Sequence, residues 1–362
     1  MLPKIGGIFF YFYVYKCILD VYNIIINISL GGNRMDINEL RLMQNYPLEL
    51  KIMKTELRIQ EWVSYYGLDG VYISFSGGKD STVLLHIARE LYPNIKALYI
   101  DTGLEYPEVK QFVKTWDNVD IVRPKMSFKQ VLENYGYPVI SKEQSQYIHQ
   151  YRVAKSEKTK KTRLEGNKWG RGKISEKWKF MINAPFKISD QCCNVMKKNP
   201  AKKYEKETGR VPIVGTLAEE SALRTTHYIK NGCNAFDSKR PKSTPLGFWT
   251  NQDILAYIKM FNLEIPSVYG DIVEVNGKLK TTKCDRTGCI YCCYGCHNES
   301  IEENRFLRLE QTHPKLHHYC INDLGLGDVL DYMNITYTNK QKTIKEKVKL
   351  GSVEGEQLKW II

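Results

Sequence analysis

Apolar positions in the middle of the chain alternate between two spacings. Short, nearly continuous apolar runs predict strands over 71–76, 96–102 and 119–123, whereas apolar residues at helical spacing predict helices over 80–91 and 107–117. Strands that alternate with helices are typical of a parallel sheet covered by helices on both faces. The predicted fold class is therefore α/β, with a Rossmann-like, doubly wound parallel sheet whose ligand site lies at the carboxyl ends of the strands.

The same pattern continues on both sides of a long interruption. A helix is predicted over 36–66, and helix 195–207, strand 211–215 and helix 250–262 follow the interruption. Composition then divides the chain along its length. The predicted segments are a non-core N-terminal extension (1–34), the first half of a nucleotide-binding α/β core (35–140), a basic aromatic insertion (141–187), the second half of the core with a cysteine-rich region (188–300) and a helical basic tail (301–362).

The N-terminal extension differs in composition from the rest of the chain. Its longest apolar run, from Ile5 to Tyr15, is too short to span a membrane, and Lys16 and Asp20 interrupt any continuation. No small-residue cleavage site follows, which disfavours a signal peptide. We expect Met35 to be the true start and the protein to be cytoplasmic, with no membrane partner. A single membrane anchor in the extension is the alternative.

A glycine-rich loop stands between the first predicted strand and the next helix. It reads Ser-Gly-Gly-Lys-Asp-Ser from Ser76 to Ser81. Glycines let the backbone approach a ligand closely, a helix N-terminus offers unpaired N–H groups and a positive dipole end, and a lysine adds a full charge. This combination favours a polyphosphate ligand, although the spacing is not that of a Walker A loop. The alternative interpretation is a tight turn capped by Asp80 or Ser81.

The positive charge of the chain is concentrated in one region. The formal net charge is +13, and residues 141–210 alone hold 19 Lys and Arg against 7 Asp and Glu. Basic side chains interleaved with aromatic ones suit a nucleic acid strand, through phosphate neutralisation and base stacking. A solvated, partly flexible insertion is the alternative of equal weight. The aromatic residues in question are Tyr147, Tyr151, Trp169, Trp178 and Phe180.

The cysteines are clustered along the chain. Of the ten cysteines, seven lie in two groups, and clustering of this kind in a nucleotide-binding protein indicates metal or cluster ligation in a reducing compartment. A disulfide framework would suit a small secreted domain instead. The first group is Cys192 and Cys193, and the second is Cys284, Cys289, Cys292, Cys293 and Cys296.

The order and spacing of these motifs resemble the phosphoadenosine phosphosulfate (PAPS) reductase family, within the PP-loop ATP pyrophosphatase superfamily. The resemblance covers some three fifths of the chain, from about Ile73 to about Cys296, and implies an adenine nucleotide alpha hydrolase-like sheet. The matching motifs are Ser76 to Ser81; Asp101-Thr102-Gly103 with Pro107-Glu108; Cys192-Cys193 with Lys197-Lys198 and Pro200; Gly215 with Glu220-Ser221 and Arg224; Pro245-Leu246 with Trp249 and Asp253; and Cys289-Ile290-Tyr291-Cys292. The nucleotide-binding residues that we expect are Ser76, Gly77, Gly78, Lys79, Asp80, Ser81, Asp101, Thr102 and Gly103.

The resemblance also implies a set of metal ligands. In iron–sulfur members of the family, a paired cysteine and a later C-x-x-C hold one [4Fe–4S] cluster, which here gives the ligands Cys192, Cys193, Cys289 and Cys292. Two alternatives follow from the spacing of the second cysteine group. A zinc site could use Cys284, Cys289 and Cys292 with Cys296 or His297, and the spacing of Cys284, Cys289 and Cys292 also suits a [2Fe–2S] centre.

Two departures from the reductases favour another reaction. The reactive cysteine motif Glu-Cys-Gly-Leu-His is absent from the sequence, and the nearest candidates are Cys296 and Cys320. The intact Gly-Gly-Lys-Asp loop is similar to that of family members that split ATP. We therefore expect an enzyme that uses ATP and Mg²⁺, releases pyrophosphate and activates an acceptor for sulfur incorporation, with Lys79, Asp80 and Arg224 as catalytic residues.

The basic insertion and the cysteines suggest the partners of this reaction. The expected acceptor is nucleic acid, either tRNA or DNA, and the expected protein partner is a sulfur donor or a thiol reductant. Asp80 and Asp101 are candidate metal or ribose contacts, and Asp101 could equally be a helix cap. One alternative function is a sulfonucleotide reductase that releases sulfite, with Cys296 or Cys320 as nucleophile. The other is a non-catalytic metal module that binds nucleic acid.

Overall fold

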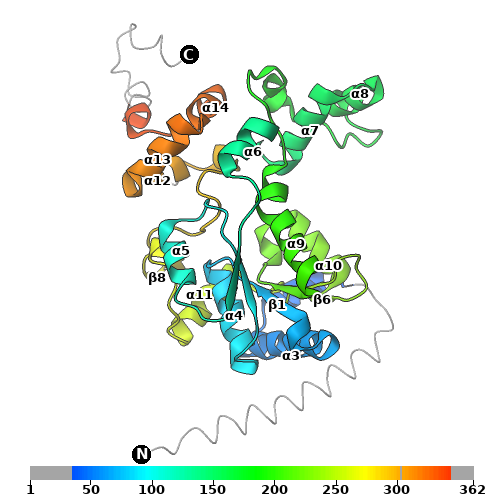
Figure 1. Cartoon of the computed structure of the whole chain (residues 1–362), viewed down its shortest axis with the longest axis vertical. Coiled ribbons are helices and arrows are strands. Elements are labelled where there is room, and N and C mark those ends of the chain that lie inside the picture. Colours follow the sequence, from blue (N-terminus) through cyan, green and yellow to red (C-terminus); the bar gives the residue numbers. More distant parts are fainter. Residues whose placement is uncertain (1–34, 302–303, 344–362) are drawn as a thin grey trace, which may run out of the picture. The chain divides into compact units, whose positions relative to one another are not determined.

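The computed structural model describes residues 35–301 and 304–343, which form two compact units (Figure 1). Of the described residues, unit 1 comprises 35–99, Gln111–Asp120 and Glu205–Arg286, and unit 2 comprises Ile100–Lys110, Ile121–Tyr204, 287–301 and 304–343. The N-terminal extension and the expected start at Met35 concern residues that lie outside, or at the edge of, the described chain. Within the described part, no helix combines the length and apolar character needed to cross a membrane.

A six-stranded sheet forms the centre of unit 1, in the order β3-β2-β1-β5-β7-β6. Strand β1 pairs in parallel with β2 and β5, β5 pairs in parallel with β7, and the edge strand β6 is antiparallel to β7. The α/β prediction with a parallel central sheet is confirmed. The strands are β1 (Val71–Ser74), β2 (Ala97–Ile100), β3 (Val119–Val122), β5 (Val211–Val214), β6 (Asn234–Ala235) and β7 (Lys242–Ser243).

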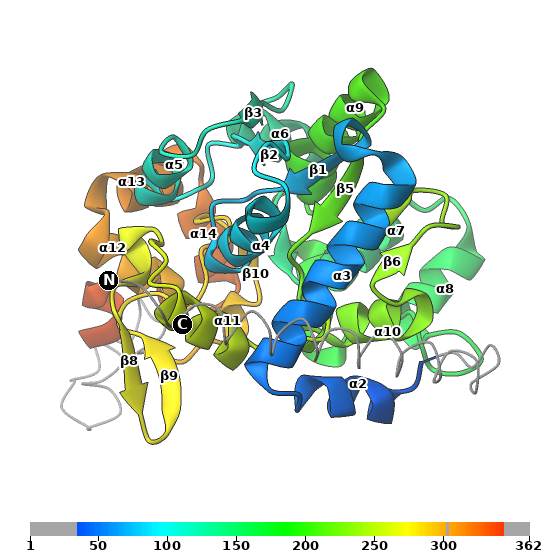
Figure 2. The same cartoon turned by 90° about the horizontal axis from the view of Figure 1, so that it is seen from below.

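Helices pack on this sheet around one apolar core. Helices α3, α4 and α11 contact one another and lie side by side in Figure 2. Helix α4 buries its apolar stripe completely, with Val83, Leu84 and Leu85 at 0% exposure. Other elements of unit 1 are shorter. The helices are α2 (Ile37–Gln44), α3 (Leu48–Tyr66), α4 (Lys79–Leu91), α10 (Ala222–Asn231) and α11 (Asn251–Met260); the 3₁₀ turns are η1 (Leu68–Gly70), η4 (Ala218–Glu220) and η5 (Ser267–Tyr269); and β8 (Ile272–Val275) and β9 (Lys278–Thr281) form a hairpin.

The helix expected over 36–66 is two helices. Helix α2 ends before Asn45, and α3 begins after Pro47. A proline disfavours helical backbone at the residue before it and has no N–H to donate, so the break falls where the sequence places Pro47. Apolar spacing alone did not reveal this break.

Unit 2 is mostly helical. Two short strands, β4 (Val139–Ile140) and β10 (Cys293–Tyr294), pair in parallel, so the later cysteine segment is joined to the segment before the insertion. Helices α5 and α9 run across the boundaries between the units. The helical elements are α5 (Pro107–Val113), α6 (Phe128–Tyr135), α7 (Lys142–Val153), α8 (Glu157–Glu165), η2 (Glu176–Asn183), η3 (Asn194–Lys198), α9 (Asn199–Thr208), η6 (Cys296–Asn298), α12 (Arg305–Thr312), α13 (Pro314–His318), η7 (Tyr319–Asp323) and α14 (Leu326–Tyr332).

The basic aromatic insertion is folded, as α7, α8 and η2. The guanidinium of Arg152 on α7 donates hydrogen bonds to the carbonyls of Met181, Ile182, Ala184 and Phe186, at 2.6–2.9 Å. These contacts hold η2 against α7 because they satisfy carbonyls at the end of a 3₁₀ turn that has no helical partners for them. The expectation of a partly flexible insertion therefore does not describe this segment. The linear segments 35–140, 188–300 and 301–362 stay predictions, since each unit combines several of them.

Candidate functional site

The glycine-rich loop is closed by its own serines. The Ser76 and Ser81 hydroxyl groups lie 3.0 Å apart, and Ser81 Oγ accepts from Ser76 N at 3.2 Å and donates to the Gly78 carbonyl at 2.9 Å. Gly77 has a φ of 72°, a left-handed conformation that favours glycine. The loop is thereby fixed as a tight turn that leads from β1 into α4.

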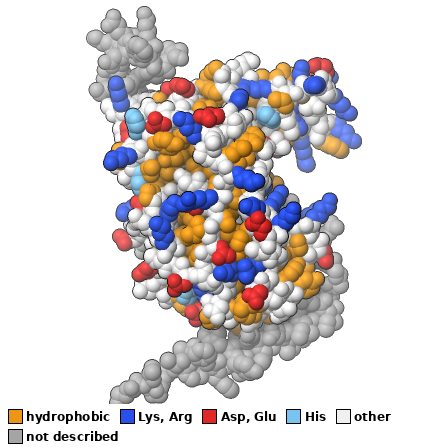
Figure 3. Space-filling view, in the orientation of Figure 1, with side chains coloured by type: hydrophobic (Ala, Val, Ile, Leu, Met, Phe, Trp, Pro, Cys, Tyr) orange, Lys and Arg blue, Asp and Glu red, His pale blue; other side chains and the backbone are white. Residues whose placement is uncertain are grey.

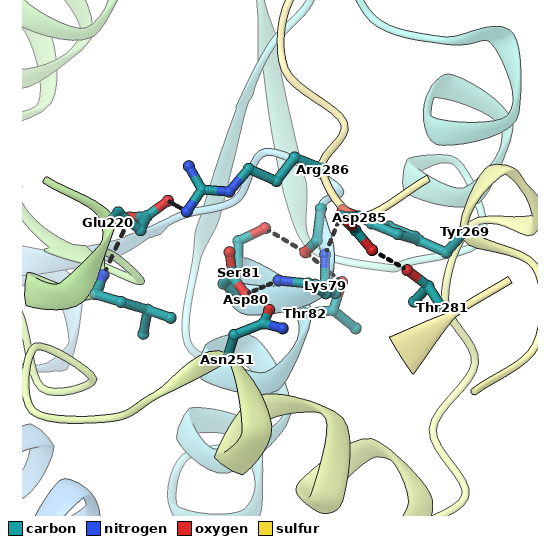
Figure 4. Close-up of polar contacts among 12 residues, drawn as sticks. Lys79, Asp80, Ser81, Thr82, Glu220, Asn251, Tyr269, Thr281, Asp285 and Arg286 are labelled. Atoms are coloured by element: carbon teal, nitrogen blue, oxygen red, sulfur yellow. Dashed lines mark hydrogen bonds and ion pairs between the residues drawn. The ribbon is translucent and has the colours of Figure 1, made fainter. Parts of the chain in front are cut away.

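Two contacts from distant segments fix the N-terminus of α4. The hydroxyl of the buried Tyr269 accepts from Lys79 N at 3.1 Å (Figure 4). Gly215, just after β5, lies so close that a Cβ there would stand 3.1 Å from the Asp80 carbonyl oxygen. Helix α4 has Gly78 as its N-cap and no side-chain cap. The alternative interpretation of the loop as a turn capped by Asp80 or Ser81 is therefore wrong.

The lysine of the loop is buried and paired. Lys79 Nζ lies 2.7 Å from Asp80 Oδ1, and the two side chains are 4% and 26% exposed (Figure 4). Burying an ammonium group is costly unless it is paired, and the contact with the Asp80 carboxylate offsets part of this cost. A buried cation at the start of a helix is suited to bind phosphate oxygens.

Two arginines flank one glutamate in the same unit. Glu220 forms an ion pair with Arg224, and Arg286 Nη2 lies 3.5 Å from Glu220 Oε1 (Figure 4). Burial and the like charge of Arg286 lower the pKa of Arg224, whereas the nearby Asp80 opposes this shift. The three expected catalytic residues, Lys79, Asp80 and Arg224, therefore lie in one region of unit 1.

The Asp-Thr-Gly segment belongs to unit 2. Asp101 is 6% exposed, and its carboxylate lies 2.8 Å from Lys110 Nζ and 3.1 Å from Arg123 Nε. Burial alone would raise the pKa of Asp101, but hydrogen bonds and charge from Lys110 and Arg123 outweigh it and lower the pKa. Thr102 is held by Glu105, which accepts from its hydroxyl at 2.7 Å. Asp101 is thus neutralised by two cations of its own unit.

The four expected cluster ligands influence one another electrostatically. Burial raises the pKa of Cys192, and Cys289, Cys193 and Cys292 each raise it further. Burial also raises the pKa of Cys292 to about 12, with Cys289 adding to the effect. Unit 2 therefore gathers the thiols of two sequence segments about 100 residues apart.

A lysine and a glutamate extend the cysteine group toward the Asp-Thr-Gly segment. The Cys289 thiolate raises the pKa of Lys197, with Glu105 as a further contributor, and Lys197 hydrogen-bonds Cys289. The backbone of Ile290 donates to the Leu104 carbonyl at 2.9 Å. The C-x-x-C segment is thereby attached to the loop that follows Gly103.

The described residues were also compared with the expected metal sites. Among residues 35–301 and 304–343, no three His, Cys, Asp or Glu side chains converge closely enough to hold one metal ion. The thiols of the zinc alternative are otherwise engaged, since Cys284 donates to the Arg286 carbonyl and Cys296 to the Cys293 carbonyl. Four cysteine thiolates are the usual ligands of a [4Fe–4S] cluster, so the residue types of the expected set fit this group, and the assignment stays a prediction.

Comparison with known proteins gives the family. The sequence matches the phosphoadenosine phosphosulfate reductase domain over residues 70–163 and 135–294, more than half of the chain. The chain belongs to this family. The intact loop from Ser76 to Ser81 is thus the PP-loop of a PAPS reductase-family protein.

Individual relatives match only in part. An uncharacterized protein of Methanocaldococcus jannaschii is 25% identical over 255 residues, which are 67% of this chain and 44% of that protein. A probable FAD synthase of Caenorhabditis briggsae is 37% identical over 82 residues, 21% of this chain and 16% of that protein. The matched part therefore spans less than half the length of either curated relative.

Two solved structures match the chain at low sequence identity. The PAPS reductase of Candida auris, in a phosphate complex, is 15% identical, with coverage of 68% of this chain and 100% of that chain and a TM-score of 0.35. The FMN adenylyltransferase of Candida glabrata, in complex with ATP, is 10% identical, with coverage of 64% of each chain and a TM-score of 0.36.

Both candidate nucleophiles of a reductase are buried in this family member. Cys296 and Cys320 are 1% and 0% exposed, and burial raises the pKa of each to about 12. A reactive thiol has a lowered pKa and access to solvent. Neither cysteine has the properties of a nucleophile.

Sequence reasoning missed three residues of these sites. Tyr269 and Arg286 were not singled out, because each reaches its site by tertiary contacts rather than by a motif. Arg286 lies three residues before Cys289, and this cysteine-rich segment was interpreted from its sequence as a metal-binding segment. Glu105 lies between the Asp-Thr-Gly motif and Pro107, and only its acidic character five residues after the end of β2 could have suggested it.

Proposed function

We propose that this PAPS reductase-family protein splits ATP into AMP and pyrophosphate and thereby activates an acceptor for sulfur incorporation. The observation that carries the proposal is the intact PP-loop, with a buried Lys79 paired to Asp80 at the N-terminus of α4. A lysine beside the phosphate cradle is most useful when pyrophosphate is the leaving group. Sulfonucleotide substrates have no β- and γ-phosphates for it to bind.

The proposed chemistry is adenylyl transfer. An acceptor oxygen forms a bond to the α-phosphorus, the bond from that phosphorus to the bridging oxygen breaks, and pyrophosphate leaves with the electron pair. Lys79 and the backbone N–H groups of the loop stabilise the charge that builds on the leaving group. A sulfur nucleophile then replaces the adenylated oxygen, and AMP leaves. Asp80 is the proposed contact for Mg²⁺ that accompanies ATP.

Arg224 and Arg286 are the proposed binding site for the acceptor or for the α-phosphate of ATP. Arg224 and Arg286 share Glu220, so a bound anion would compete with this carboxylate for two cations. Arginine presents several N–H donors in a planar fork that matches phosphate oxygens. In this proposal Arg224 holds the charged group that reacts, and Glu220 keeps the arginines oriented before substrate binds.

The cysteine group is the proposed site of a [4Fe–4S] cluster, held by Cys192, Cys193, Cys289 and Cys292. Such a cluster, when bound, supplies sulfide storage or electron transfer close to the protein surface that receives a sulfur donor or thiol reductant. Lys197 is placed to offset the negative charge of the thiolates, as its coupling to Cys289 indicates.

The proposed acceptor is nucleic acid, either tRNA or DNA. The supporting observation is the folded basic insertion in a chain with a net charge of +13. Proteins with a concentrated positive surface bind polyanions through phosphate contacts and counterion release.

A pyrophosphate-release assay tests the function. The full chain is purified without oxygen and incubated with ATP and Mg²⁺, alone and with bulk tRNA or DNA, while iron and the visible spectrum are recorded on the same sample. Pyrophosphate release stimulated by one nucleic acid supports the proposal and identifies the acceptor class. An iron-replete sample that releases none overturns it, and sulfite release from a sulfonucleotide with thioredoxin-type thiols would then identify a reductase. Salt-sensitive nucleic acid binding without either activity would identify a non-catalytic module.

A further inference from the structure

An exposed tryptophan stands on a tightly bonded loop in the insertion. Asn167 Oδ1 accepts from the backbone N–H groups of Trp169 and Arg171, both at 3.0 Å, and Asn167 N donates to the Arg171 carbonyl at 2.7 Å. The backbone of Gly170 also donates to the Asn167 carbonyl at 2.8 Å. These hydrogen bonds within the segment fix the shape of a small loop. Trp169, at the tip of this loop, is 69% exposed.

The loop is anchored to the helices beside it. Arg163, on α8, donates to the Gly172 carbonyl and, through Nε, to Gln150 Oε1 at 2.8 Å. Its guanidinium also lies over the ring of Tyr147, 4.4 Å from the centroid. Two of the expected basic and aromatic residues, Arg163 and Tyr147, therefore serve the structure. Trp178 is likewise a core residue, at 8% exposure, which leaves Trp169 as the exposed tryptophan of the insertion.

Cations surround this tryptophan on a surface without an apolar face. Helix α8 has no buried residue, and residues 155–179 contain ten Lys and Arg against three Glu. Figure 3 shows Lys and Arg side chains gathered over the region of α7 and α8. Lys168 lies with Nζ 4.2 Å from the centroid of the Trp169 ring. The exposed cations nearby in sequence are Lys158, Lys161, Lys168, Arg171 and Lys173.

We propose that the Trp169 loop is a docking site for a single-stranded or looped segment of nucleic acid. An unpaired base stacks on the Trp169 ring, and Lys158, Lys161 and the loop cations contact the neighbouring phosphates. The biological meaning of this site rests on the proposed function, in which nucleic acid is the acceptor.

The geometry favours nucleic acid over the other anionic surfaces. A membrane-binding helix needs an apolar face to enter the lipid, and α8 has none. A large exposed aromatic ring is disfavoured in water and is typical of a contact surface. Its placement among cations supplies both parts of a single-strand site, a stacking platform and a positively charged path for the backbone. A base in a duplex is already stacked, so an unpaired base is the expected partner.

Oligonucleotide binding by the full chain tests the proposal. Fluorescence anisotropy is recorded with labelled single-stranded oligouridine, single-stranded oligothymidine and a blunt duplex of the same length, over a series of salt concentrations and without ATP. We expect Trp169→Ala to weaken single-strand binding about tenfold or more, the effect of losing one stacked base. Trp169→Phe should retain most of the affinity. The matched control is Tyr65→Ala, since Tyr65 is also 69% exposed but lies on α3 of unit 1.

Each outcome decides the proposal. Equal affinities of Trp169→Ala and the unaltered chain, tighter binding of the duplex than of both single strands, or no binding at low salt would overturn it. A difference between oligouridine and oligothymidine identifies the source of the strand, RNA or DNA, and supports the docking site in either case. Because no ATP is present, a chain that binds through Trp169 but releases no pyrophosphate would overturn only the proposed function. The reverse result would overturn only the docking site.

Discussion

The PP-loop site and the cysteine site differ in how their buried ionisable groups are paired. In unit 1 each charged group of the site already has a partner, because Lys79 pairs with Asp80 and the two arginines share Glu220. In unit 2 the thiols gather next to one another, and burial raises the pKa values of Cys192, Cys289 and Cys292. Lys197 is the cation that couples most directly to them.

This difference indicates what each site needs from a ligand. The cations of the PP-loop site already have carboxylate partners before substrate binds, so a phosphate group has to compete with Asp80 and Glu220. Burial raises the pKa of Cys192, Cys289 and Cys292, and a metal centre would have to displace the protons of such thiols to bind. Under the proposed function, the first site would bind its ligand reversibly and the second would hold a permanently bound group.

Removal of one cysteine is the strongest test of the proposed difference between the two sites. We expect Cys289→Ser to abolish bound iron in the anaerobically purified full chain, because a serine cannot replace one of four thiolates in a cluster. Iron content and visible absorbance are the measurements. Cys284→Ser and Cys296→Ser are the matched controls and should retain iron. Loss of bound zinc in these controls, with no iron in any sample, would contradict the assignment.

Removal of the buried lysine should have the next largest effect. Lys79→Ala is expected to slow pyrophosphate release by about 10²–10³-fold, the range found when one preorganised electrostatic contact to a transition state is lost. Initial rates at saturating ATP measure this effect. Lys259→Ala, at an exposed position on α11 of the same unit, is the control and should not change the rate. A Lys79→Ala rate close to that of the control would place the chemistry elsewhere.

A smaller effect on pyrophosphate release is expected when one of the two arginines that share Glu220 is removed. Arg286→Ala removes one of two cations on Glu220 and should lower kcat/KM for pyrophosphate release about tenfold, the order expected for one hydrogen bond to a charged group. Arg41→Ala, on the exposed face of α2, is the control. If Arg286→Ala matches this control while Arg224→Ala is strongly impaired, Arg286 supports the fold of its segment rather than the reaction.

The smallest effect is expected at Asp101 in unit 2. Its lowered pKa means that its ion pairs stabilise the folded state fully above the ordinary aspartate pKa of about 3.9 and cease to do so as the pH falls through the lower folded-state value. Asp101→Asn should therefore reduce the free energy of unfolding at pH 7 by about 1 kcal/mol, a modest amount because the partner cations are partly exposed. The difference from the unaltered chain should shrink as the pH falls through the lowered pKa.

Melting temperatures across this pH range measure the Asp101 effect. Asp120→Asn is the control and should show a weaker change, because the Asp120 carboxylate, 3.3 Å from Lys96, is more exposed than that of Asp101. A loss of nucleotide binding in Asp101→Asn without any loss of stability would instead support the ribose or metal contact predicted from the sequence.

The elements with strong periodicity could be predicted from the sequence, and the contacts between distant segments could not. Strand β1, the loop and helix α4 follow one another in the chain, and the hydrogen bonds of the loop join residues no more than five positions apart. Strands β4 and β10, which pair Val139 with Cys293, are too short to form an apolar run from which a strand could be predicted. The break at Pro47 was missed because apolar spacing continues across it.

The sequence by itself determined the fold class, the family and the PP-loop, since local spacing and residue type are sufficient to form them. Only the tertiary structure decided that the Tyr269 hydroxyl accepts from the Lys79 N–H at the start of α4, that two cations neutralise Asp101 and that Trp178 is buried while Trp169 is exposed. It also decided that cysteines about 100 residues apart share one environment. Such contacts depend on how whole elements pack, because burial and the pairing of buried charges are properties of the assembled core and not of any one segment.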